Sequence, residues 1–260
     1  MNKYFYFLIA LLAGCSTSPE NRLNQLKVAA TPVPHAQMLE FVKPELKEQG
    51  YDLKIIVVED YNIPNRALAD HEVDANFFQH IPFMDAQIKQ FGYAIESLAA
   101  IEIEPMGLYS KKISNLSELK NGAKIAIPND PTNEARALLL LQAHGLIELD
   151  DSSNLQATVL NIVENPKKLQ FIEVDAAMLP RSLHDVDAAA INTNYALEAH
   201  LSPEKALIIE TRDSPYANII AVRKGEENHP KLQALKASMT SVRMKEFIEK
   251  KYKGAVIPAF

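Results

Sequence analysis

A chain of 260 residues is long enough to form one large domain or two smaller ones. Hydrophobic residues make up 47% of it and charged residues 23%, a globular balance that excludes a largely disordered protein. The formal net charge of −6 argues against a nucleic-acid-binding protein, because such proteins need a basic surface to displace counterions.

The N-terminal segment has the features of an export signal. Lys3 supplies a positive charge, and residues 4–12 form an apolar run. That run is far shorter than the ~20 residues of a membrane-spanning helix. The sequence Leu12-Ala13-Gly14-Cys15 resembles the lipobox of bacterial lipoproteins, in which the cysteine becomes the acylated first residue. We therefore expect lipidation at Cys15; the alternative is a core strand with a buried thiol. As Cys15 is the only cysteine, no disulfide is expected.

Downstream of this segment, the hydrophobic pattern alternates between strands and helices. Strands are expected at residues 26–30, 53–58, 74–80, 93–103, 124–127, 170–174, 187–191 and 217–222. Helices or helical turns are expected at residues 35–49, 61–70, 81–91, 116–120, 131–144, 180–183, 193–200, 230–239 and 240–252. Pro44 lies inside the first of these helices, so a kink is expected near Lys43.

This α/β pattern is interrupted near Pro105 and then begins again, which favours two α/β lobes with a ligand cleft between them. The two final helices have no sheet of their own, and we expect them to pack on the first lobe. The expected organisation is a signal peptide at 1–14, a tether at 15–25, a first lobe at 26–107 and 219–260, and a second lobe at 108–218.

Residues 74–83 are the strongest candidate for a ligand site in the first lobe. Three phenylalanines and His80 occur where a strand runs into a helix, and the carboxyl end of a strand is a common ligand position in α/β proteins. The alternative is that Phe77 or Phe78 belongs to the core and that His80 only caps the helix.

In the second lobe, Asp130 and Pro131 favour a helix start whose free N–H groups attract an anion. Arg136, one turn later, suits a bidentate contact with a carboxylate, although a solvated arginine is an equal alternative. Asn192 follows a strand and Asn218 lies at the return crossing, so both are candidate ligand contacts. Each asparagine is also typical of a turn or cap.

Enzyme motifs are absent from the sequence. There is no Gly-x-Ser-x-Gly, P-loop or Gly-x-Gly-x-x-Gly motif. His71 and His80 with nearby acids lack the His-Glu-x-x-His spacing of a zinc site, so no metal is expected and no cofactor is implied.

Several motifs together resemble the methionine-binding lipoproteins of the NlpA/MetQ family, the substrate-binding components of ABC importers. They are residues 74–82, 128–133, 179–183, 191–196 and 214–218. They occur in family order and spacing, and the resemblance runs from Leu26 to the C-terminus. It implies a two-lobed, periplasmic-binding-protein-like α/β fold of type II.

The resemblance also implies roles for particular residues. Tyr61, Phe78, His80 and Phe83 match the positions that enclose the ligand's thioether, and sulfur packs favourably at aromatic ring edges. Arg136 matches the arginine that binds the carboxylate, and Asn192 and Asn218 match asparagines that hold the ammonium and carboxylate groups.

Phe77 and Phe83 depart from the family, because many members have tyrosine at these positions. The missing hydroxyl at Phe83 would remove a polar contact, so a strict preference for free L-methionine stays open. Phe77 lies on the opposite face of its strand from Phe78 by the period of two, and we assign it to the core.

The resulting hypothesis is a monomeric, non-catalytic lipoprotein that binds L-methionine and delivers it to an ABC permease and its ATPase. It would be exported and held by the lipid on Cys15 at the periplasmic or cell-surface side of a bacterial membrane. Alternatives are the same role with D-methionine, a methionine-containing dipeptide or another apolar amino acid. An exported hydrolase and a surface adhesin are alternatives from other classes.

Overall fold

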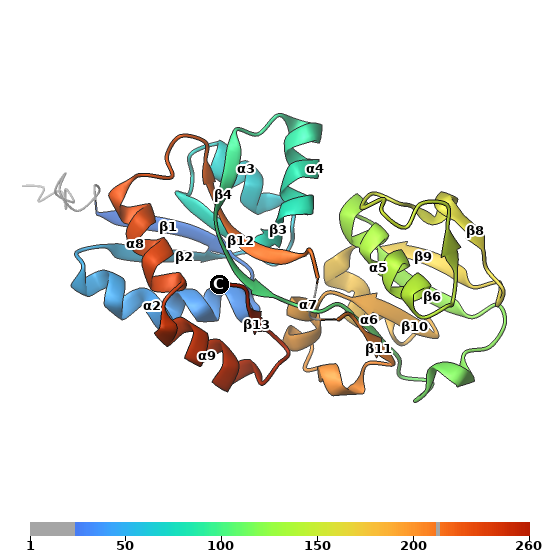
Figure 1. Ribbon diagram of the computed structural model, residues 1–260. Coiled ribbons are helices and arrows are strands. Elements are labelled where there is room, and N and C mark those ends of the chain that lie inside the picture. Colours follow the sequence, from blue (N-terminus) through green and yellow to red (C-terminus); the bar gives the residue numbers. More distant parts are fainter. Residues whose placement is uncertain (1–23, 212–213) are drawn as a thin grey trace, which may run out of the picture.

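The computed structural model describes residues 24–211 and 214–260, and Cys15 lies outside them. It contains a six-stranded sheet (sheet A) of order β13-β4-β12-β3-β1-β2 and a five-stranded sheet (sheet B) of order β11-β5-β10-β6-β9. Figure 1 shows the two sheets side by side with helices around each. The predicted α/β fold with two lobes is confirmed.

Sheet A is assembled from both ends of the described chain. Its strands are β1 (Gln25–Ala30), β2 (Asp52–Val57), β3 (Ala75–His80), β4 (Ile95–Ile103), β12 (Ala217–Arg223) and β13 (Ile257–Pro258). β1 pairs in parallel with β2 and β3, as expected for strands joined through helices. β12 runs antiparallel between β3 and β4, so the returning chain is inserted into the first sheet.

Sheet B is formed by the intervening part of the chain. Its strands are β5 (Gly107–Tyr109), β6 (Lys124–Pro128), β9 (Gln170–Val174), β10 (Ala188–Ile191) and β11 (Ile208–Ile209). A separate antiparallel pair consists of β7 (Glu148–Leu149) and β8 (Ile162–Glu164). β6 pairs in parallel with β9 and β10, which gives this sheet a parallel centre.

Helices cover both faces of each sheet. Those around sheet A are α2 (Gln37–Glu48), α3 (Ile63–Ala69), α4 (Ile81–Phe91), α8 (Pro230–Met239) and α9 (Val242–Tyr252), with a π-helical turn η1 (Pro32–Ala36) before α2. Those around sheet B are α5 (Pro131–Ala143), α6 (Leu179–Ser182) and α7 (Thr193–Glu198). The expected packing of the last two helices on the first lobe is confirmed, because Leu235 and Ile248 share a buried cluster with Val28 and Phe77.

The kink expected at Pro44 is not observed as a break, because α2 runs as one helix through this residue. Pro44 is on the exposed side of α2, where water can bond the carbonyl group that proline leaves without its N–H partner. Among the described residues, no helix has the length and apolar character needed to cross a membrane.

The chain leaves sheet A and returns to it close to the predicted crossings. Gly107 already belongs to β5 of sheet B, whereas Ala217 and Asn218 belong to β12 of sheet A. The strand pairing therefore assigns these residues differently from the expected lobe bounds, by one or two positions. We did not expect β5, β7, β8, β11 and β13, because two or three residues are too few to show a period.

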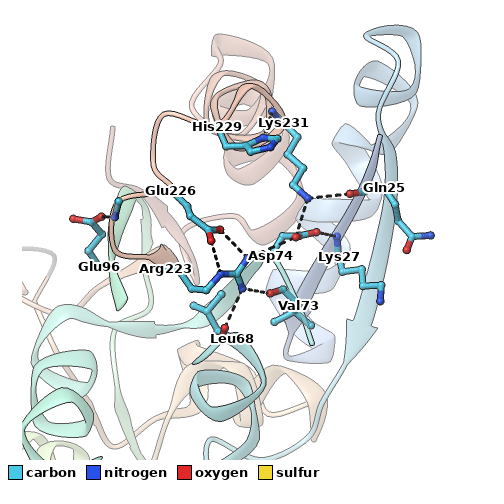
Figure 2. A network of polar contacts seen from close by, with 11 residues as sticks. Gln25, Lys27, Leu68, Val73, Asp74, Glu96, Arg223, Glu226, His229 and Lys231 are labelled. Carbon is cyan, nitrogen blue, oxygen red and sulfur yellow. Dashed lines mark hydrogen bonds and ion pairs between the residues drawn. The ribbon is translucent and has the colours of Figure 1, made fainter. Parts of the chain in front are cut away.

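A polar network anchors the returning chain at the amino end of β3 (Figure 2). Asp74 accepts hydrogen bonds from the Lys27 backbone N–H at 2.7 Å and the Lys231 ammonium at 2.8 Å. Arg223 lies 3.8 Å from the same carboxylate, donates to Glu226 and also donates to two backbone carbonyl oxygens. Asp74 thereby ties β1, β12 and α8 together at the opposite end of β3 from His80.

Candidate functional site

The residues predicted to bind the ligand meet at one cavity between the two lobes. The cavity encloses about 310 Å³, including its mouth. It is lined by all of the candidates: Tyr61, Phe78, His80, Phe83, Arg136, Asn192 and Asn218. Gln79, Glu104, Asn133, Thr193 and Asn194 complete the lining. Residues from β3 and β12 of sheet A therefore face residues from α5 and the start of α7.

One side of this cavity is aromatic. The ring centroids of Phe78 and Phe83 lie 5.7 Å apart, and each lies 5.8 Å from that of Tyr61. Phe78 is on the cavity face of β3, and Phe83 is in the first turn of α4. Phe77 points to the other face, where it is fully buried against the His35 ring at a centroid distance of 4.4 Å. The prediction that Phe77 belongs to the core is confirmed.

His80 caps α4, as one of the two interpretations expected, and it also lines the cavity. Its Nδ1 accepts a hydrogen bond from the Phe83 N–H at 3.2 Å. Nε2 must then carry the proton, which it directs to Asn133 Oδ1 at 3.3 Å. Burial, with a further effect from the positive charge of Arg136, lowers the pKa of His80 to about 3. The ring is therefore neutral at physiological pH.

Asn133 is a site residue that the sequence interpretation did not single out, although it ends one of the quoted motifs. Its Oδ1 also accepts from Asn192 Nδ2 at 2.8 Å, so it joins His80 of one lobe to Asn192 of the other. Its Nδ2 donates to both carboxylate oxygens of Asp130 at 3.0 Å. Asp130 in turn caps α5 by accepting from the Asn133 N–H, as expected. The helix start is thus ordered as a rigid polar edge of the cavity.

Arg136 is buried, with only 3% of its surface exposed, and the alternative of a solvated arginine is wrong. Its Nε and Nη2 donate to the two carboxylate oxygens of Glu210 at 2.8 and 2.6 Å. Nη2 also donates to the Glu104 carbonyl oxygen, and the guanidinium lies 4.5 Å from the centre of the Tyr216 ring. Burial alone would lower the pKa of Arg136, but the charge and hydrogen bonds of Glu210 outweigh it and raise this pKa. Among the described residues, none accepts from Nη1.

Asn218 lies beside a buried cluster that the sequence interpretation also missed. Its Nδ2 is 3.3 Å from His35 Nε2, and that nitrogen is 3.1 Å from Glu102 Oε1 and 3.2 Å from Glu104 Oε1. Within the described chain, His35, Glu102 and Glu104 are the one group with three potential metal ligands close together. However, the Asn218 amide places N–H donors among these ligand atoms, which disfavours a cation.

Hydrogen bonds across the cavity hold the two lobes together. Tyr61 donates its hydroxyl proton to Asn194 Oδ1 at 2.7 Å, and Tyr195 donates to the Glu59 carbonyl oxygen at 2.9 Å. The His80–Asn133 bond is a third contact of this kind. The cavity is therefore observed in a closed arrangement, with polar links on the sides of the ligand space.

Several buried polar atoms around the cavity have no hydrogen-bond partner among the described residues. Glu104 Oε1 and Asn192 Oδ1 are acceptors of this kind, and Asn194 Nδ2 is a donor. Buried polar groups in native proteins are almost always paired, so these atoms call for a partner that enters from outside. A ligand with both N–H donors and carboxylate acceptors would satisfy them.

Comparison with known proteins identifies the family of this chain. The NlpA lipoprotein family model matches residues 26–260. The methionine-binding lipoprotein MetQ of Bacillus subtilis (strain 168) is 43% identical over 251 residues, which cover 94% of this chain and 92% of that protein.

Two solved structures extend the comparison. A nutrient binding protein from Burkholderia cenocepacia bound to methionine has a TM-score of 0.88 and 48% identity, covering 90% of this chain and 100% of that one. An ABC transporter periplasmic substrate-binding protein from Coxiella burnetii has a TM-score of 0.86 and 49% identity, with the same coverage. The present chain belongs to the NlpA lipoprotein family.

Proposed function

We propose that this protein is the substrate-binding component of an ABC importer and that it binds methionine in the cavity between its lobes. One observation carries the proposal. Side chains from residue 61 to residue 218, distant in sequence and from both lobes, converge on one cavity with an aromatic side and a polar side. This division matches an amino acid with an apolar side chain, and solved relatives include a protein bound to methionine.

The aromatic side suits a thioether. Tyr61, Phe78 and Phe83 lie at tilted or perpendicular angles to one another, so ring edges as well as faces line this side of the cavity. Contacts between a thioether sulfur and aromatic rings contribute ~0.3–1.5 kcal/mol each. Phe83 offers no hydroxyl, so this wall selects by shape and polarizability. D-methionine, a methionine-containing dipeptide and another apolar amino acid remain candidates for the same cavity.

The polar side suits the charged end of an amino acid. We assign the ligand's carboxylate to Nη1 of Arg136 and to the amide of Asn218, and we assign Asn192 to the ammonium group. Since Glu210 already neutralises Arg136, the guanidinium would act mainly as an oriented hydrogen-bond donor. Selectivity would then depend on the geometry of these donors more than on net charge.

Catalysis is not part of the proposal. His80 is neutral, with its pKa lowered to about 3, and both ring nitrogens already have hydrogen-bond partners. It therefore lacks the free, titrating nitrogen that a general base requires near neutral pH. We propose a binding protein whose lobes close on the ligand, because only the closed state allows both lobes to contact it.

The remaining parts of the proposal concern topology and location. We propose a signal peptide at 1–14, lipidation of Cys15, a tether at 15–25 and a monomer that delivers its ligand to a permease and ATPase. The lobes would be residues 26–107 with 219–260, and 108–218, apart from the one or two residues at each crossing that the strands assign to the other sheet. The protein would be exported and held by its lipid on the periplasmic or cell-surface side of a bacterial membrane.

The test begins with mass spectrometry of the small molecule that co-purifies with the protein, followed by calorimetry with L-methionine. Asn218→Ala and Arg136→Ala should each weaken binding at least tenfold, a loss of ~1.4 kcal/mol or more. Asn228→Ala, at an exposed asparagine, is the matched control and should bind as the parent does. Unchanged affinity in both site variants, or turnover of an ester or peptide substrate, would contradict the proposal.

A further inference from the structure

The buried cluster behind the cavity consists of His35, Glu102 and Glu104. None of the three exceeds 4% exposure, and only Glu104 lines the cavity itself. Glu102 and Glu104 are two residues apart on an extended segment, so their side chains share one face. Both approach the same nitrogen of His35, at 3.1 and 3.2 Å. The polar end of the cavity is therefore backed by two carboxyl groups in close contact.

The protonation of this cluster follows from its burial. Desolvation lowers the pKa of His35 and raises the pKa of Glu102 to about 7. Desolvation, and secondly the neighbouring Glu102, raise the pKa of Glu104 to about 8. Near pH 6 both carboxyl groups are thus protonated and the imidazole is neutral. Its Nδ1 lies 2.5 Å from Thr31 Oγ1, which leaves Nε2 to donate to the carboxyl oxygens.

Among the described residues, the other charged and titratable groups around the cluster do not pair with Glu104 Oε1. Arg136 is committed to Glu210, and neutral His80 faces Asn133. Tyr61 and Tyr252 interact electrostatically with these carboxyl groups. Both tyrosines keep their protons, because burial in the first place raises their pKa values. The positive charge of Arg136 lowers the pKa of Glu104, but this effect is smaller than that of desolvation, and among the described residues no cation donates a hydrogen bond to Glu104 Oε1.

Two acceptors at the cavity are available to a ligand with N–H donors. Glu104 Oε1 lies near His35 Nε2 but receives no hydrogen bond with suitable geometry, and Asn192 Oδ1 also has no donor among the described residues. Both residues line the cavity. A primary ammonium group carries three donors and a positive charge, so it fits a carboxylate beside an amide oxygen.

We propose that Glu104 accepts the ligand's ammonium group, that His35 and Glu102 position it, and that binding releases one proton from this cluster. In this step one carboxyl O–H bond breaks, its proton passes to solvent, and the carboxylate formed accepts N–H bonds from the ligand. The second proton stays shared between Glu102 and Glu104. The inference rests on the proposed function and names the residue that makes this site specific for a primary ammonium.

Ligand affinity should depend on pH, because binding displaces a proton from the cluster. Below pH 7 the ligand must displace a proton, so affinity should fall up to about tenfold for each pH unit of acidification. By pH 8 the cluster has already lost that proton while the ligand's ammonium group is still charged, so this dependence of affinity on pH should level off there. An amino acid would thus be held more weakly in an acidified environment.

Calorimetry of the full-length protein with L-methionine, in buffers of different ionisation enthalpy, measures the number of protons released for each ligand bound. We expect close to one proton released at pH 6 and close to none near pH 8. Glu104→Gln should weaken binding at least tenfold at pH 8 and abolish the release at pH 6. Glu96→Gln, on β4 near the end far from Glu102 and Glu104, is the matched control and should change neither quantity.

A ligand analogue provides a test that needs no variant. 4-(Methylthio)butanoate lacks the ammonium group, and the parent protein should bind it at least 100-fold more weakly than L-methionine and release no proton. If L-methionine binds without proton release, or Glu104→Gln binds it normally, the inference fails while the proposed function stands. If L-methionine does not bind at all, the proposed function fails first. Binding of zinc chloride by the parent but not by Glu104→Gln would also overturn the inference, in favour of a cation site.

Discussion

Tyr61→Phe isolates the contribution of one bond across the cavity. The Tyr61 hydroxyl donates to Asn194 Oδ1 at 2.7 Å, and the two residues come from opposite lobes. The substitution keeps the aromatic ring that faces Phe78 and Phe83 and removes only the hydroxyl. Because the bond exists only when the lobes are together, its loss should reduce ligand affinity and leave the folding of each lobe unchanged.

The magnitude follows from the surroundings of Asn194. A hydrogen bond contributes ~0.5–1.5 kcal/mol net, but leaving a buried partner unpaired costs ~1–3 kcal/mol. Asn194 is 2% exposed and its Nδ2 already lacks an acceptor, so the variant would strand the whole amide. We expect a loss of ~1–2 kcal/mol, a five- to thirtyfold rise in Kd that arises mainly in the dissociation rate.

Tyr252→Phe is the matched control, because it removes a buried hydroxyl with partners in the same lobe. That hydroxyl lies 3.0 Å from Gln37 Oε1 and 3.3 Å from the Pro34 carbonyl oxygen. The control should lower the thermal unfolding temperature of the ligand-free protein without changing the calorimetric Kd. An equal Kd for Tyr61→Phe and the parent, or an equal rise in both variants, would refute a bond specific to the closed state.

Three further predictions concern other regions. Asp74→Ala should lower the free energy of unfolding by ~2–3 kcal/mol, because it leaves several donors of the network in Figure 2 without an acceptor, while Asp70→Ala at an exposed ion pair should cost under ~0.5 kcal/mol. Denaturant unfolding of the two variants measures both losses, and equal losses would contradict the role of the network. Glu102 and Glu104 bind protons more tightly when folded, with pKa values of about 7 and 8, so their contribution to stability is complete below pH ~4 and is lost as pH rises through 7–8. Thermal unfolding against pH should show this decline in the parent and a flatter profile in the Glu102→Gln/Glu104→Gln double variant. Cys15→Ala should move the protein from the membrane fraction to the soluble fraction, and retention would contradict lipidation.

The regular elements were predictable because local signals and tertiary packing agree. The strand of β3 and the helix of α4 follow from Pro82 and from the glycine that ends the helix, Gly92, which has a left-handed φ of 74°. The period of two also separated Phe77 from Phe78 correctly. The resemblance to a known family then added Tyr61, whereas Glu104 and Asn194, which also line the cavity, were singled out neither by a local pattern nor by the resemblance.

The pairings within the site were beyond prediction from one sequence. Glu210 meets Arg136 only because β11 lies at the edge of sheet B, and nothing near either residue indicates the other. The cluster of His35, Glu102 and Glu104 likewise depends on η1 packing behind the end of β4. Isolated charged residues in a sequence are usually solvated, and their burial becomes visible only when the sheets are assembled.

These buried groups also explain how a ligand could control closure. In the closed arrangement Glu104 Oε1, Asn192 Oδ1 and Asn194 Nδ2 lack partners, and each such atom costs ~1–3 kcal/mol. Together they oppose closure by ~3–9 kcal/mol, whereas moving an equilibrium from 1:99 to 99:1 needs ~5.5 kcal/mol. A ligand that satisfies all three atoms would therefore remove a penalty of the same order as the free energy that controls closure. An analogue without the ammonium group would leave two acceptors unpaired, so it should fill the aromatic side of the cavity without stabilising the closed state.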